Sequence, residues 1–140
     1  MSLQIPKNKQ FISQKSAIIE PSIMQIGLIN KRGRLVDSIG PDSTGMPDDK
    51  KEMFFMGVAL IRSMQKDYDE EMGPLNYILL QRQNLKFILI PADDDESVLI
   101  ISKKGFDHEK FLKKHYQLLQ NKNQFLDMKI LEEGRQIESL

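Results

Sequence analysis

The pattern of apolar and polar positions divides this chain of 140 residues into short helices and strands. Apolar residues at helical spacing predict a first helix over residues 7–19. A run that is apolar on both faces predicts a strand over 23–30, in the interior of a sheet. A tight turn at Gly33 then joins it to a second strand over 34–39, because glycine tolerates the positive φ that such turns require.

A long central helix follows, and its first half is apolar on every face. Asp49 and Glu52 have the spacing of a capping box at its start, and Gly73 predicts its end near residue 72. Residues 53–61 contain no charge over more than two helical turns. A helix on the outside of a small sheet normally has one polar face, so this stretch needs cover on two sides.

The remainder of the chain predicts three strands and one further helix. The strands cover residues 75–82, 85–91 and 97–102, and the helix covers 108–120. Residues 121–140 keep only a weak helical pattern, which indicates a peripheral helix or a tail.

The predicted order is therefore helix, strand, strand, helix, strand, strand, strand, helix, followed by a C-terminal helix or tail. We expect an α/β protein of the α+β type, in which a five-stranded antiparallel sheet is sandwiched between the long central helix and the terminal helices. No linker divides the chain, so residues 1–120 form one predicted domain and residues 121–140 an extension.

Composition narrows the class of protein. The chain is 40% hydrophobic and 29% charged, with zero formal net charge, which argues against a general nucleic-acid or membrane-surface binder. It has no apolar run of membrane-spanning length and no secretory signal pattern at its N-terminus. The absence of cysteine excludes disulfides and thiolate chemistry and agrees with a cytoplasmic location.

Two segments carry a resemblance to a known family. The run over residues 27–36, with a turn at Asn30, is similar to the first hairpin of the roadblock/dynein light chain family, which often has Asp where Asn30 stands. Residues 85–91 and 98–101 resemble that family's last strand pair. The resemblance implies a profilin-like α/β fold with sheet order second, first, fifth, fourth, third, and archaeal proteins of unknown function share the pattern.

The same resemblance implies a homodimer formed through the long helix and the strand after it. This agrees with the central helix being apolar on two sides over residues 53–61, since a large exposed apolar patch usually marks an interface. The alternative is that the chain's own terminal segments cover the helix. The residues expected in the dimer interface are Phe54, Phe55, Met56, Val58, Ile61, Leu75 and Tyr77.

The function implied is a non-catalytic interaction or scaffold module that binds or regulates a Ras-like small GTPase. The alternative is a profilin-like or PAS-like sensory domain that holds a small molecule between sheet and helix. A polar group isolated within apolar strands would favour the sensor, and Gln25 and Asn76 are the candidates.

No arrangement of residues matches a catalytic or cofactor-binding template. The acidic run over residues 93–96 lacks calcium-loop spacing and is expected to be a solvated hairpin tip. His108 and His115 lie about 10 Å apart along a helix, too far for one metal ion. We therefore expect no metal site, no cofactor and no enzymatic activity.

Basic residues gather at two turns. Lys31, Arg32 and Arg34 form the tip of the first hairpin, and Lys103 and Lys104 begin a second cluster. Both are possible contacts for an acidic or phosphorylated partner, and the alternative is a solvated charged surface.

Overall fold

The structure is a computed structural model that describes residues 21–40 and 44–120. The predicted helix over residues 7–19 and the predicted extension over residues 121–140 lie outside the described residues. The described elements are β1 (Ile23–Ile29), β2 (Leu35–Ile39), α2 (Asp48–Gln65), η3 (Lys66–Tyr68), α3 (Asp69–Met72), β3 (Ile78–Gln81), β4 (Leu85–Pro91), η4 (Asp93–Asp95), β5 (Ser97–Lys103) and α4 (His108–Gln120).

The five strands form one antiparallel sheet in the order β2-β1-β5-β4-β3. This confirms the five-stranded antiparallel sheet and the strand order that the family resemblance implies. β1, β5 and β4 are interior strands, and for β1 its apolar run on both faces predicts this position. β3 is shorter than predicted and, like β2, lies at an edge of the sheet.

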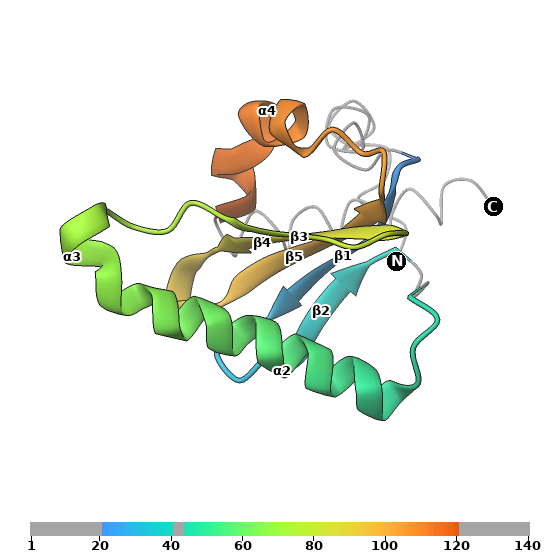
Figure 1. Ribbon diagram of the computed structural model, residues 1–140, viewed down its shortest axis with the longest axis horizontal. Helices are drawn as coiled ribbons and strands as arrows, with labels where there is room; N and C mark the ends of the chain where they lie inside the picture. Colours follow the sequence, from blue (N-terminus) through green and yellow to red (C-terminus); the bar gives the residue numbers. More distant parts are fainter. Residues whose placement is uncertain (1–20, 41–43, 121–140) are drawn as a thin grey trace, which may run out of the picture.

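One helix covers each face of the sheet, as Figure 1 shows, with α2 on one side and α4 on the other. Side chains alternate between the faces along each strand, so the two clusters use alternate positions. The cluster under α4 contains Ile23, Ile26, Leu28, Ile39, Ile88, Ile90, Val98, Ile100, Phe106, Phe111, Leu112 and Leu119. The cluster under α2 contains Ile29, Phe55, Val58, Ala59, Phe87, Leu89, Leu99 and Ile101.

The turn between β1 and β2 is stabilised by Asn30. Its side-chain oxygen accepts hydrogen bonds from the backbone N–H groups of Arg32, at 2.9 Å, and Arg34, at 3.0 Å. Gly33 adopts a φ of 84°, as the turn pattern predicts. A side chain at Gly33 would have its Cβ only 2.6 Å from the Cα atom of Met56, so this glycine lets α2 approach the hairpin closely.

The central helix differs from the prediction at its start. It begins at Asp48, after Pro47, and no side chain caps it. Asp49 instead accepts a hydrogen bond from the adjacent N–H of Lys50. The predicted capping box is therefore wrong, because Asp49 lies within the first turn rather than ahead of it.

The helix is also interrupted before its predicted end. α2 gives way to the 3₁₀ turn η3 and then to the short helix α3. The chain leaves α3 at Gly73, whose φ of 83° suits glycine, as predicted. Among the described residues, no helix has the length and apolar character needed to cross a bilayer.

We expect Gly33→Ala to destabilise the protein by about 3 kcal/mol, because the new Cβ meets backbone atoms that no rotamer change can move. Gly45→Ala is the matched control. Gly45 also has a positive φ, of 75°, but its Cβ would meet nothing within 4 Å. Gly45→Ala should lose only about 1–2 kcal/mol of stability, which is the cost of an alanine in the left-handed region of φ. Urea unfolding measures the free energy of unfolding of both variants. Equal losses of stability in the two variants would contradict the close approach of α2 to Gly33.

Candidate functional site

The outer face of α2 carries a continuous row of exposed apolar side chains, which we call the α2 stripe. Met53, Met56, Leu60 and Met64 recur every three or four residues, which places them on one side of the helix, and Ile61 follows directly after Leu60. Three are methionines, whose unbranched side chains adapt to irregular surfaces. The exposed fractions are 72% for Met53, 54% for Met56, 59% for Leu60, 38% for Ile61 and 58% for Met64.

The inner face of α2 lies on the sheet of the same chain. Phe55 and Val58 are buried there, and the ring of Phe54 packs on that of Phe87 with centroids 4.6 Å apart. Phe55 and Val58, which the sequence analysis expected in a dimer interface, face the sheet of their own chain. Phe54 is half-buried and contributes to the same inner cluster.

The last two residues of the predicted dimer set lie away from the α2 stripe. Tyr77 packs against the cluster under α4, and its ring lies edge-on to that of His108 at 5.9 Å. Leu75 is half-buried and lines a small cavity with Arg62 and Pro91. Of the predicted set, only Met56 and Ile61 are exposed on the outer face of α2.

Arg62 joins α2 to the connection between β4 and β5. Its Nη1 donates hydrogen bonds to the backbone oxygen of Glu96 and, at 2.8 Å, to the hydroxyl of Ser97. Burial lowers the pKa of the Arg62 guanidinium, while the carboxylates of Asp95 and Asp69 act in the opposite direction. Arg62 was not among the predicted site residues. Its place in the sequence, as the first charged residue after the uncharged run over residues 53–61, could have marked it as a candidate.

The acidic connection is only in part the solvated tip that the sequence predicts, because Asp93 and Asp95 are exposed while Glu96 is buried. Residues 93–95 form a 3₁₀ turn, Glu96 is buried, and Asp95 takes a φ of 61°. The carboxylate of Asp95 accepts a hydrogen bond from Lys66 Nζ at 3.1 Å. That hydrogen bond is the main cause that lowers the pKa of Asp95. The connection therefore docks on α2 and η3, because Arg62 and Lys66 provide the donors that its oxygens need.

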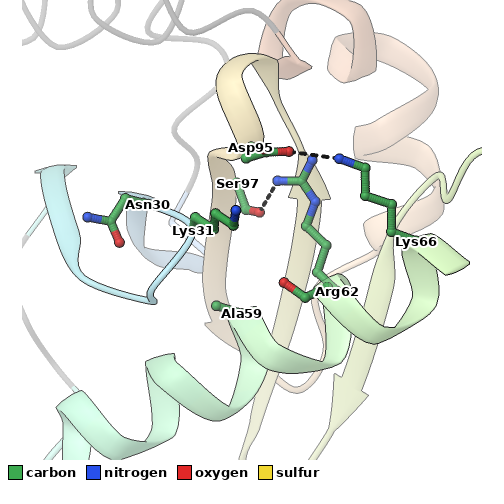
Figure 2. Close-up of a pocket in the computed structure, with 8 residues that line it drawn as sticks. Asn30, Lys31, Ala59, Arg62, Lys66, Asp95 and Ser97 are labelled. Carbon is green, nitrogen blue, oxygen red and sulfur yellow. Dashed lines mark hydrogen bonds and ion pairs between the residues drawn. The ribbon is translucent and has the colours of Figure 1, made fainter.

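A small pocket opens where the first hairpin, the last turns of the long helix and this connection meet. Figure 2 shows the basic side chains Lys31, Arg62 and Lys66 around it, with Asp95 bonded to Lys66. The cavity volume is about 210 Å³. We call it the basic pocket, and its lining residues are Asn30, Lys31, Ala59, Arg62, Ser63, Lys66, Asp95 and Ser97.

The structure does not bring the two predicted basic clusters together. Ile29, next to the hairpin that carries Lys31, Arg32 and Arg34, pairs with Ser97 at the start of β5. Lys103 and Lys104 follow the other end of β5. All five basic side chains are exposed, but they lie at opposite ends of the sheet.

Neither histidine lies in a group suited to metal binding. His108 Nδ1 lies 3.3 Å from Lys86 Nζ, and the ring of His115 packs on Phe111 with centroids 4.9 Å apart. Within residues 21–40 and 44–120 no three metal-ligating side chains converge. Lys86 is buried in β4 and donates to the backbone oxygen of Phe106, a role the sequence analysis missed.

No family model matches the sequence, and no curated protein matches it. Solved structures do match its fold, with TM-scores above 0.5 and identities of 9–11%. The roadblock/LC7 domain from Streptomyces avermitilis has a TM-score of 0.53 at 10% identity and covers 69% of this chain and 80% of its own. The chain has the roadblock/LC7 fold.

Two MglB proteins with the same fold match over more of the chain. MglB from Thermus thermophilus has a TM-score of 0.55 at 9% identity and covers 91% of this chain and 90% of its own. Myxococcus xanthus MglB has a TM-score of 0.53 at 11% identity and covers 93% and 91%. At identities of 9–11%, the similarity to these roadblock/LC7 structures establishes the fold and does not establish the function.

We expect Arg62→Leu to destabilise the protein by about 1–3 kcal/mol, because the Glu96 carbonyl and the Ser97 hydroxyl lose their shared donor. Lys66→Gln is the control, since it removes a positive charge from the same segment in an exposed pair. Because that pair is exposed, Lys66→Gln should lose less than about 1 kcal/mol, clearly less than Arg62→Leu. A loss as large as that of Arg62→Leu would show that net charge, rather than the Arg62 bonds, stabilises the segment.

Proposed function

We propose that the protein is a non-catalytic interaction module that acts as a homodimer through the α2 stripe. The observation that carries this proposal is the row of five exposed apolar side chains on α2, Met53, Met56, Leu60, Ile61 and Met64. Scattered single apolar residues are normal on protein surfaces, but a contiguous row is typical of an interface.

The self-association is supported by the shape of the surrounding surface. Gly57 lies on the exposed side of α2, and a Cβ there would meet nothing within 4 Å, so a second helix can come close to the backbone. β3 is an edge strand whose Leu79 is 37% exposed, which offers unpaired backbone groups beside an apolar side chain. A twofold arrangement would cover the same stripe on both copies.

The proposed partner of this module is a Ras-like small GTPase. The roadblock/dynein light chain family, to which residues 27–36 are similar, includes the bacterial gliding-motility GTPase-activating protein, and one structure with this fold, MglB from Thermus thermophilus, is described as a gliding protein. One solved MglB carries the description of a tetrameric arrangement, which agrees with a fold that self-associates. In this proposal the chain presents a surface to the GTPase and contributes no catalytic group.

We expect Met56→Glu and Leu60→Glu each to convert the dimer into a folded monomer, because an unpaired carboxylate would lie in a desolvated interface. Gln65→Glu is the matched control, since it adds the same charge to an exposed position of α2 outside the stripe. Light scattering after size exclusion gives the mass of each. A wild type that is monomeric at micromolar concentration would contradict the dimer.

The GTPase partner is tested by parallel co-purification from native lysate with the wild type and Met56→Glu as baits. The expected result is enrichment of a Ras-like GTPase by the wild type, with an amount that changes between added GDP and a non-hydrolysable GTP analogue. A dimeric wild type that enriches no GTPase under either nucleotide would overturn the GTPase role and leave the dimer standing.

A sensory domain remains the second candidate, because of one buried polar atom. Gln25 is only 5% exposed in β1, and its side-chain oxygen has no hydrogen-bond partner among the described residues. Such an atom normally finds a partner, which a bound ligand can supply. Asn76, the other candidate, is exposed, and its backbone oxygen accepts a hydrogen bond from Tyr116. The cavities described above do not include Gln25 in their linings.

We expect Gln25→Leu to raise the free energy of unfolding by about 1 kcal/mol, since it removes an unsatisfied buried oxygen. A thermal-shift panel of small molecules, run on the wild type and on Gln25→Leu, separates the two functions. If the protein is a scaffold without a ligand at Gln25, no compound should stabilise the wild type more than it stabilises Gln25→Leu. A compound that stabilises the wild type but not Gln25→Leu would favour the sensor.

A further inference from the structure

The basic pocket holds more positive than negative charge. Its lining includes three cations, Lys31, Arg62 and Lys66, against the single carboxylate of Asp95. That carboxylate is already hydrogen-bonded to Lys66 at 3.1 Å. Two positive charges of the lining therefore have no negative counterpart inside the pocket.

Arg62 is the central group of this pocket. It is half-buried, and its hydrogen bonds within the described ranges go to the Glu96 carbonyl and the Ser97 hydroxyl, neither of which is charged. Both bonds use Nη1, so the donors on Nη2 and Nε remain for a further acceptor. A partly desolvated guanidinium is most stable when an anion completes its contacts.

Other donors surround the same space. Ser97 accepts from Arg62 through its oxygen, which leaves its own hydroxyl hydrogen to donate. Lys31 reaches the pocket from the β1–β2 turn, on a different side from Arg62 (Figure 2). Ala59 contributes only a methyl group to the lining, which keeps the cavity open.

We propose that the basic pocket binds a tetrahedral oxyanion, either free phosphate or the phosphate group of a small monoester. Donors that come from a turn, a helix and a strand suit oxygens that point in several directions. The volume of about 210 Å³ is below that of pockets for drug-sized ligands, so the pocket fits a phosphate group and little more. No member of the α2 stripe lines the pocket, so this site is independent of the proposed dimer.

The test titrates inorganic phosphate and glycerol 1-phosphate separately into the full chain, by calorimetry at low ionic strength, where exposed charges are least screened. Saturable binding of one molecule per chain is expected, with acetate at the same concentration giving no saturation. Tighter binding of glycerol 1-phosphate identifies a monoester ligand, and equal or weaker binding identifies free phosphate. No saturable binding of either compound at millimolar concentration would overturn the proposal.

Charge-neutral variants show whether the pocket is the binding site. Lys31→Gln and Lys66→Gln should each weaken phosphate binding by about fivefold, and both residues are exposed, so both variants should fold. Lys103→Gln and Lys104→Gln are the matched controls, because they remove the same charge at the opposite end of the sheet, and they should bind as the wild type does. Equal weakening by all four variants would show a general charge effect and would overturn the site.

Discussion

The contact between α2 and the sheet decides the rest of this structure. At one end of the contact, Gly33 allows the β1–β2 turn to lie directly against the backbone of Met56. At the other end, Arg62 bonds to the start of β5 through Ser97. Phe55, next to Met56, and Val58, between Met56 and Arg62, are buried on the sheet. A helix held at two points along its length and packed on the sheet there cannot rotate about its axis, so its inner and outer faces are set.

Both surfaces with a proposed role follow from that fixed orientation. The α2 stripe is exposed because the opposite side of the helix is already buried against its own strands. The basic pocket exists because the same docking brings Lys66 and Arg62 next to the hairpin that carries Lys31. The proposed association surface and the proposed anion site thus lie on neighbouring sides of one helix. They share no residue, so a substitution in one leaves the side chains of the other in place.

The fold was largely accessible to sequence reasoning, and the site was not. Residues 85–91 and 108–120 were predicted with the bounds that β4 and α4 have, because apolar spacing and turn residues act locally. The capping box failed because Asp49 has the right spacing but lies two residues beyond the N-cap position, which Pro47 occupies. The sequence did not reveal that Phe55 and Val58 face the sheet, since a helix that is apolar all round gives no sign of which face meets it.

The sequence by itself determined the order of elements, the interior character of β1, and the need for cover on two sides of the central helix. Each of these depends on apolar spacing within a few turns or one strand. Tertiary structure alone decided that Arg62 and Lys66 hold the acidic connection, that Lys31 joins them, and that Lys103 lies far away. Those relations depend on how distant segments dock, and a charged side chain carries no local signal of the partner it will meet.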